Sequence, residues 1–265
     1  MKKFALGMLA AVAMTGSAVA ADMAPRYTKA PPPAPIAVYT WTGCYIGGNV
    51  GAGWERTRQT QIGKVGIPAL VLNNDFGSSN GTDVVGGGQI GCDYQFANNW
   101  VIGIQGMYDY GRMSSTHIVP TAFPGFPVGS FNSVNQVKDM WTVTGRVGYL
   151  FTPQLLGYVK GGGAWTRVDH TFNGFVPTPF LSENALGVNR SGYTVGGGLE
   201  WQFARGWSVF GEFNYMDFGS RDVAFIAGPA TVGAPDVVRT KLEIEQFLVG
   251  VNYKFNFASP VVAKY

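Results

Sequence analysis

Four charged side chains in the second half of the chain have the types and spacing for ion-pair chemistry. Two are cations and two are anions, and each lies about five to seven residues from a segment that reads as a short turn: Arg146, Lys160, Glu200 and Glu212. Similar distances from the turns predict a similar depth on consecutive elements. We therefore predict an internal ion-pair cluster. The alternative chemistry is an ion path or gate through the same four side chains.

The sequence contains two cysteines, Cys44 and Cys92. Both are expected on the same face of neighbouring strands, three or four residues from one end of each strand. Because exported chains fold in an oxidising compartment, we predict a cross-strand disulfide. The alternative is a pair of free thiols, since cross-strand geometry only sometimes accommodates the bridge. Two cysteines so far apart do not make a zinc site.

Nucleophilic catalysis would require a histidine held beside a serine or a carboxylate. The two histidines, His117 and His170, fall in segments expected to be surface loops, with Ser115 and Asp169 nearby. A rigid triad borne on strands is missing from this pattern, so we predict no enzymatic activity, no metal and no cofactor. The loop histidines could instead contact a ligand, together with loop phenylalanines at Phe123, Phe126, Phe175 and Phe180.

The elements that must position these residues are strands, because apolar and polar residues alternate with period two from Trp41 onward. In the segment after Lys160, the inward assignment of that lysine also turns Tyr158 inward. In the last segment, Leu242 and Ile244 are out of phase with the residues that follow, which predicts a β-bulge near Glu245 or Gln246. The eight expected strands are about 41–54, 82–96, 100–110, 139–151, 155–167, 191–203, 207–218 and a last one that ends near residue 255.

The connections between these strands alternate strictly between short and long. Three are only about three residues, whereas 55–81, 112–138, 168–190 and 219–240 each exceed twenty residues. This alternation is typical of a transmembrane barrel with short periplasmic turns and long extracellular loops. Aromatic residues also gather near both ends of the strands, as in interfacial girdles. We predict an all-β fold, an antiparallel up-and-down transmembrane barrel of eight strands with four long extracellular loops.

Glycine is frequent and recurs in triplets at 86–88, 161–163 and 196–198. The spacing Gly86-x-Gly88-x-x-Gly91 matches a dinucleotide fingerprint, but that fingerprint requires a helix to begin at the glycines, and here a strand continues. We expect the triplets to relieve crowding and to permit curvature in a narrow barrel.

The N-terminal region reads as an export signal. Lys2 and Lys3 precede an apolar stretch, and Ala18-Val19-Ala20 is a small-x-small cleavage site. Removal of the two lysines lowers the formal charge from +3 to +1, so no basic surface for nucleic acid is expected. The predicted parts are a signal peptide, a proline-rich periplasmic leader, the barrel and a C-terminal periplasmic tail, at 1–20, 21–39, 40–257 and 258–265.

Two segments give the chain a family resemblance. Residues 41–49, Trp-Thr-Gly-Cys-Tyr-Ile-Gly-Gly-Asn, and residues 249–255, Val-Gly-Val-Asn-Tyr-Lys-Phe, resemble the small outer-membrane barrel proteins of alphaproteobacteria, a porin-like family similar to the OmpA transmembrane domain. The resemblance implies insertion into the outer-membrane bilayer by the assembly machinery, with both termini in the periplasm. It also implies an assembly signal of alternating hydrophobics, here Val249, Val251, Tyr253 and Phe255. The chain continues for ten residues beyond that signal.

The predicted function is a structural outer-membrane barrel with surface-exposed loops and a lumen plugged by the ion-pair cluster, because eight strands leave room only for side chains. One alternative is a narrow porin-like channel for small solutes. A second is a receptor or adhesin that recognises an extracellular ligand or a host surface through its loops, although no ligand is identified by the sequence.

Overall fold

Eight long strands and one very short strand account for nearly all of the structure, a computed structural model that describes residues 39–67, 72–97, 99–120, 128–174, 182–227 and 234–255. None of these residues forms a helix long and apolar enough to cross a membrane. The strands are β1 (Gly43–Lys64), β2 (Asn74–Phe96), β3 (Trp100–Ile118), β4 (Phe131–Thr152), β5 (Leu155–Gly174), β6 (Ser182–Ala204), β7 (Trp207–Ala224), β8 (Ile226–Ala227) and β9 (Asp236–Phe255).

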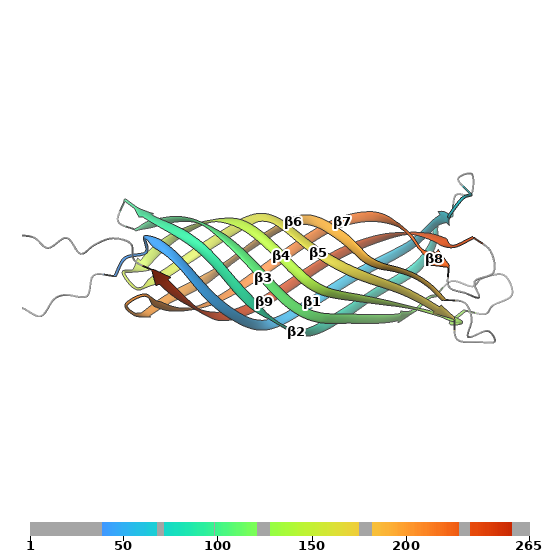
Figure 1. Ribbon diagram of the computed structural model, residues 1–265, viewed down its shortest axis with the longest axis horizontal. Helices are drawn as coiled ribbons and strands as arrows, with labels where there is room; N and C mark the ends of the chain where they lie inside the picture. The colour runs from blue at the N-terminus through green and yellow to red at the C-terminus, as the bar shows by residue number, and fades with distance from the viewer. Residues whose placement is uncertain are drawn as a thin grey trace, which may run out of the picture. The chain divides into compact units, whose positions relative to one another are not determined.

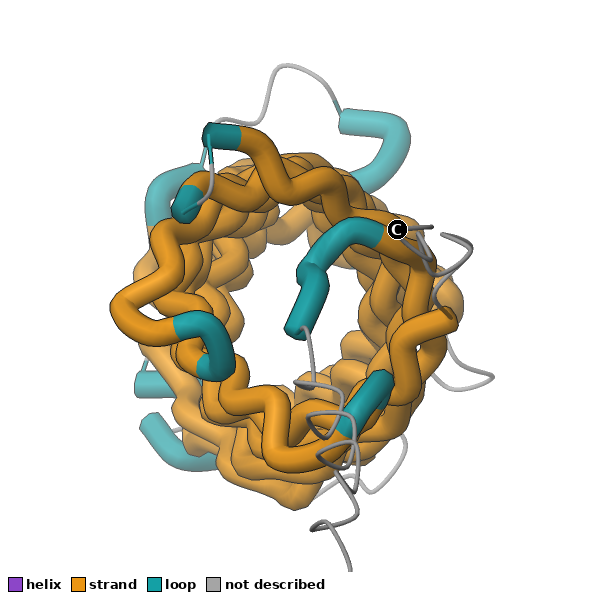
Figure 2. Tube along the Cα trace, turned by 90° about the vertical axis from the view of Figure 1, so that its left-hand side faces the viewer, coloured by secondary structure: helices purple, strands orange, loops and turns teal. Residues whose placement is uncertain are grey.

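The long strands form a closed antiparallel ring (Figures 1 and 2). Consecutive strands pair with each other from β1 to β7, β9 pairs with β7, and β1 pairs with β9 to close the sheet. The two-residue β8 adds only a short pairing to β6. The barrel of eight antiparallel strands expected from the alternation pattern is therefore confirmed. Closure pairs both edges of every long strand. A bilayer requires such pairing, because its hydrocarbon core offers no hydrogen-bond partners to free backbone groups.

The two ends of the barrel differ in their connections. At one end, called here the turn end, the links β2–β3, β4–β5 and β6–β7 comprise only two or three residues, and β1 starts beside the end of β9. At the other, the loop end, the links are 65–73, 119–130, 175–181 and 225–235. These connections are longer than the turns. They are shorter than the connections predicted from the sequence, because every strand continues past the range expected for it.

The strand extensions escaped the sequence analysis for a physical reason. Beyond Trp54, β1 alternates between buried Thr57 or Gln59 and exposed Arg56 or Arg58, so both of its faces are polar. An apolar face against a polar one is the signal by which strands are recognised in a sequence. The ladder continues through these residues all the same, with Arg58 opposite Ser78 on one side and opposite Lys241 on the other.

The outer surface of the barrel carries an apolar band between two aromatic girdles. On β4 the band runs from Trp141 to Tyr149, with Val143 and Val147 exposed between them. This length matches the nine to eleven residues with which a tilted strand crosses a bilayer core. The turn-end girdle contains Tyr94, Phe96, Trp100, Tyr149, Phe151, Trp201, Phe203, Trp207, Tyr253 and Phe255, and the loop-end girdle Trp54, Tyr110, Trp141, Trp165 and Tyr193. Residues beyond the loop-end girdle lie outside the bilayer core.

The prediction of a bulge near Glu245 or Gln246 is wrong. The register of β9 against β1 runs without a shift from Lys241 to Phe255, and burial alternates strictly along the same stretch. Leu242 and Ile244 therefore face the interior, where they are almost completely buried, while Phe247 faces outward. The two hydrophobic runs had suggested one face that changes phase. They belong instead to opposite faces of one regular strand.

Inward-facing glycines allow the strands and their side chains to pack closely. A Cβ atom on Gly87 would lie 1.8 Å from the main-chain oxygen of Tyr108, and one on Gly162 would lie 2.0 Å from that of Val143. Outward-facing Gly211 would meet nothing within 4 Å. Crowding thus accounts for glycine at the inward positions but not at Gly211.

Candidate functional site

The interior of the barrel at the level of the apolar band is occupied by ionised side chains from facing strands. Arg146 on β4 donates two hydrogen bonds to Asp93 on β2, one of them from Nε to Oδ1 at 2.7 Å, and a third from Nη1 to Glu200 on β6 at 3.1 Å. Lys254 on β9 reaches the same Asp93 carboxylate at 2.7 Å. All four side chains are nearly inaccessible to solvent. Each charge is therefore compensated by an opposite charge inside the ring.

A second buried pair lies beside the first. Lys160 on β5 donates to Glu212 on β7 at 2.7 Å and to Gln105 on β3 at 3.0 Å. The hydroxyl of Tyr158 donates to the other oxygen of Glu212 at 2.8 Å, and the Arg146 guanidinium lies 5.1 Å from the Tyr158 ring centre. Tyr158 thereby connects the two pairs. We call the six ionised residues the waist network: Asp93, Arg146, Lys160, Glu200, Glu212 and Lys254.

The structure places the four charges that the sequence singled out in two contacts, Arg146 with Glu200 and Lys160 with Glu212. The sequence analysis did not include Asp93 or Lys254 in the cluster. A signal for Lys254 was present, because it stands between outward-facing Tyr253 and Phe255 and so takes the inward phase. Asp93 belongs to the inward-facing, polar phase of its strand, but its distance from the four charges is not apparent without the register.

Neutral polar side chains complete the hydrogen bonding around these charges. Asn252 Nδ2 and the Ser208 hydroxyl both donate to Glu200 Oε1. Gln89 Nε2 donates to Asn252 Oδ1 at 2.7 Å and its Oε1 accepts from Asn49 at 2.9 Å. Buried ion pairs are stable only when such additional bonds satisfy their remaining lone pairs and protons. In the waist network, the hydrogen bonds from Asn252 and Ser208 to Glu200 meet this condition.

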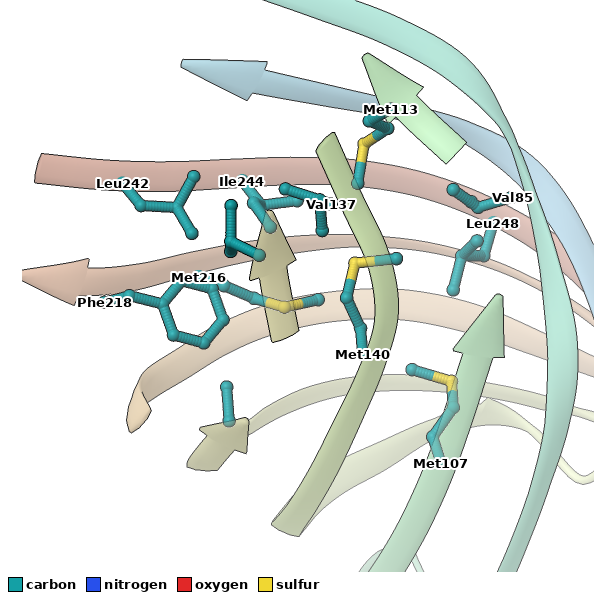
Figure 3. Close-up of a cluster of buried hydrophobic side chains, with 12 residues drawn as sticks. Val85, Met107, Met113, Val137, Met140, Met216, Phe218, Leu242, Ile244 and Leu248 are labelled. Atoms are coloured by element: carbon teal, nitrogen blue, oxygen red, sulfur yellow. The ribbon is translucent and has the colours of Figure 1, made fainter. Parts of the chain in front are cut away.

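A cluster of buried apolar side chains forms a layer inside the barrel (Figure 3). This layer lies on the loop side of the waist network. The register places it there, since the inward residues of β9 run from Lys254 and Asn252 to Leu248, Gln246, Ile244 and Leu242. The polar side chain in this run, Gln246, donates to the sulfur of Met140. Four methionines contribute flexible side chains that fill irregular space. We call it the methionine layer: Val85, Met107, Met113, Val137, Met140, Ala164, Val168, Met216, Phe218, Leu242, Ile244 and Leu248. The sequence analysis did not predict it.

A polar layer and a second apolar layer follow toward the loop end. Along β5 the inward residues are Val168 of the methionine layer, then His170, then Phe172. The polar layer includes Glu55, Thr57, Gln59, Ser79, Ser115, Ser133, Asn135, His170, Arg190 and Thr240. The outer apolar layer contains Phe76, Val119, Phe131, Phe172, Ala185, Val223, Phe225 and Val238. The rings of Phe76 and Phe131 both stack on that of Phe172.

The two histidines lie in strands and not in loops, contrary to expectation. His170 is buried, with Nδ1 2.6 Å from Asn135 Oδ1. Burial, together with the charge of Arg190, lowers its pKa to about 3. His117 Nε2 lies 2.7 Å from the main-chain oxygen of Phe76. Neither histidine bonds its expected neighbour: Asp169 faces outward to Lys138, and the Ser115 hydroxyl bonds Glu55 and Ser79. The four loop phenylalanines lie outside the described residues.

The remaining predicted residues lie in the wall of the barrel. Cys44 and Cys92 face each other in the register of β1 and β2 and are joined by a disulfide in the structure. The four residues of the expected assembly signal are exposed on the outer face of β9. Within the described ranges, no group of three histidine, cysteine, aspartate or glutamate side chains could hold a metal ion. The glycines of the apparent dinucleotide motif lie inside continuous β2.

Comparison with known proteins places this architecture in a family. The family model of the outer membrane protein beta-barrel domain matches residues 8–255. The 31 kDa outer-membrane immunogenic protein of Brucella melitensis is 29% identical over 269 residues, which cover 96% of this chain and 100% of that protein. The 25 kDa outer-membrane immunogenic protein of the same species is 24% identical over 96% of this chain and 99% of its own length.

A likeness to solved structures accompanies the sequence match. The outer membrane protein OprG of Pseudomonas aeruginosa aligns with 81% of this chain and 97% of its own, at a TM-score of 0.44 and 14% identity. The family assignment rests on the sequence match, since that match spans most of the residues. The chain belongs to the outer membrane protein beta-barrel family and is an outer-membrane protein.

Proposed function

We propose that the protein is a structural barrel of the outer membrane, with a lumen closed to solutes and with its loop end displayed at the cell surface. The waist network is the observation that carries this proposal. Six ionised side chains meet inside a ring of eight strands, whose interior is just wide enough for side chains. Arg146 reaches across β3 to Asp93 and across β5 to Glu200, so its contacts extend over five of the eight strands.

The two apolar layers add a second barrier to the same path. Water and ions that passed the charged waist would next meet the methionine layer and then the stacked phenylalanines of the outer apolar layer. Unpaired charges are costly in such surroundings. A narrow channel for small solutes, the alternative reading of the charges, would require all three layers to open together.

Surface display follows from the orientation that we propose, with the turn end and both termini in the periplasm. Residues 1–20 would then be removed on export, and a leader at 21–39 and a tail at 258–265 would flank a barrel within 40–257. Val249, Val251, Tyr253 and Phe255 would serve the assembly machinery as its recognition signal. Protease added to intact cells should then cleave only in the four loop-end connections.

A second function, recognition of an extracellular ligand or a host surface, is supported by the relatives. Two Brucella proteins with which this chain aligns over nearly its full length are named immunogenic, a term that implies contact of those proteins with the host immune system. Deletion of single loop-end connections separates the two functions. A receptor would lose binding while membrane insertion persisted, whereas a purely structural barrel would lose only surface epitopes. No enzymatic activity forms part of either proposal.

The closed lumen is tested by osmotic swelling of liposomes that contain the purified barrel. A closed barrel admits small sugars and amino acids no faster than protein-free liposomes do. Arg146→Ala and Glu200→Ala barrels, which lose bulk and charge at the waist, provide the comparison. Rapid swelling with the unmutated protein would refute the closed lumen and favour the channel.

A further inference from the structure

Arg190 is a buried cation of the polar layer without an ionic partner. It lies on β6 and is 2% exposed. Its Nη2 donates to the main-chain oxygen of Thr240 at 3.0 Å, while Nε and Nη1 have no hydrogen-bond partner in the described part of the chain. The other cations buried to this degree differ, since Arg146, Lys160 and Lys254 each contact a carboxylate.

The described carboxylates on the strands around Arg190 do not point toward its guanidinium. Thr166 faces it in the register of β5, and Asp169 further along β5 alternates with buried Val168 and His170 and so points outward. On β7, Asp217 lies between buried Met216 and Phe218 and likewise points outward. On the β1 wall, Glu55 accepts hydrogen bonds from the hydroxyls of Thr57 and Ser115. Electrostatically, the charged neighbour that acts on Arg190 is Arg221, another cation.

The undescribed parts of the loop-end connections cannot supply a carboxylate side chain either. Residues 68–71, 121–127, 175–181 and 228–233 contain neither aspartate nor glutamate. An uncompensated charge in the interior is strongly unfavourable relative to the same charge in water. Water does not reach the guanidinium freely, because Arg190 is almost completely buried and Thr166, its partner in the register, lies between Ala164 and Val168 of the methionine layer. Among the described side chains and those of the loop-end connections, none supplies the negative charge that would compensate Arg190.

Three further polar atoms of the same layer have no partner among the described residues: the Thr240 hydroxyl, His170 Nε2 and Glu55 Oε2. The Glu55 carboxylate is not among the charged groups that act on Arg190. Thr240 already contacts Arg190 through its main chain, and the charge of Arg190 acts on His170. Arginine N–H groups and a threonine hydroxyl are hydrogen-bond donors, the groups that an anion requires.

We propose that Arg190 and the Thr240 hydroxyl bind a small monovalent inorganic anion of the halide class inside the lumen. A single guanidinium charge matches a monovalent ion, and the almost complete burial of Arg190 favours a small one. The same burial separates the ion from bulk solvent, so it enters as the barrel folds and exchanges slowly afterwards. This site is independent of the orientation and of the surface role proposed above.

The direct test is to refold the protein in bromide without chloride and to determine its crystal structure with anomalous scattering from bromine. We expect one bromide ion in contact with Arg190 Nε or Nη1. An Arg190→Gln barrel should lack it, while Arg58→Gln, which removes an exposed arginine from the outer face of β1, should retain it. Two results would overturn the proposal. One is water alone at Arg190, and the other is bromide confined to the outer surface, which would be an adventitious ion only.

A solution measurement gives an independent readout. The urea midpoint of unfolding is followed as bromide replaces gluconate at constant ionic strength. Because an ion that binds only the folded state stabilises it by mass action, the midpoint of the unmutated and Arg58→Gln barrels should rise with bromide. The midpoints of the Arg190→Gln and Arg190→Met barrels should not change with bromide concentration, even where they differ from the midpoint of the unmutated protein. A rise of equal size in all four proteins would contradict a site at Arg190.

Discussion

Arg146 and Asp93 form a two-point ion pair inside the lumen that bridges over β3, the strand between those that carry them. Their side chains are almost wholly buried, and the same aspartate also accepts a hydrogen bond from Lys254. Three strands are therefore connected through one carboxylate. The stability of the barrel should be sensitive to this carboxylate in particular.

Asp93→Ala should lower the free energy of unfolding by about 3–5 kcal/mol, because it leaves buried cations without their shared counter-charge. The matched control is Asp222→Ala, which removes the exposed partner of Arg239 and should cost at most about 1 kcal/mol. Urea unfolding of barrels refolded in detergent, followed by the gel shift between unheated and heated samples, measures both. Equal losses for the two variants would argue against a structural role of the waist network.

Two glycines of opposite orientation test whether interior crowding determines where glycine is needed. Gly87→Ala should reduce the yield of folded barrel and destabilise it by about 1–3 kcal/mol, the usual cost of overpacking, because its Cβ would collide with the Tyr108 main chain. Gly211→Ala meets open space and should stay within about 0.5 kcal/mol of the unmutated protein. If both substitutions were tolerated, the strands would be less tightly packed than described.

The outward face of the barrel could be predicted from the sequence because it is apolar against a polar inner face. Ile90 and Tyr94 on β2 and Val143 on β4 follow this rule, and they fix the strand phase without knowledge of the fold. The register was not available in the same way. Hence the depth of Arg146 and Glu200 was predicted to be similar, but not the bond of Asp93 to both Arg146 and Lys254.

The interior layers could not be predicted, because an apolar side chain does not reveal whether it faces lipid or lumen. Leu242 and Ile244 produced the false bulge for this reason: they face inward against outward-facing Lys241, Glu243 and Glu245, whereas from Phe247 onward the outward face of β9 is the apolar one. Beyond Trp54, the extension of β1 has polar residues on both faces, so the alternation by which a strand is recognised is missing there. His170 was consequently predicted to lie in a loop, although it is buried inside the ring.

His170 should make the barrel less stable in acid. Its pKa is about 3 in the folded protein against an ordinary 6.5, so between these values the unfolded chain binds a proton that the folded chain does not. The contribution is a loss of up to about 1.4 kcal/mol per pH unit as the pH falls from 6.5. Urea midpoints at pH 7 and pH 4.5 should differ less in His170→Gln than in the unmutated barrel. Identical differences would mean that His170 is protonated when folded.

The cysteine pair should be oxidised in the protein isolated from cells. Denatured, unreduced protein should show no thiols by titration, and two after reduction. Cys44→Ser with Cys92→Ser should still insert, since the β1–β2 ladder continues far beyond this point, but should unfold at lower urea by the equivalent of about 2–4 kcal/mol. Two free thiols in the unreduced sample would exclude the bond.

The central claim is that the lumen is closed, and electrical recording across a planar bilayer tests it most directly. The unmutated barrel should insert without conductance steps above the baseline, while Arg146→Ala with Glu200→Ala should show small or flickering steps at most, because the methionine layer remains. Stable, large open-channel steps from the unmutated protein, at the voltages that leave the lipid alone silent, would contradict the account.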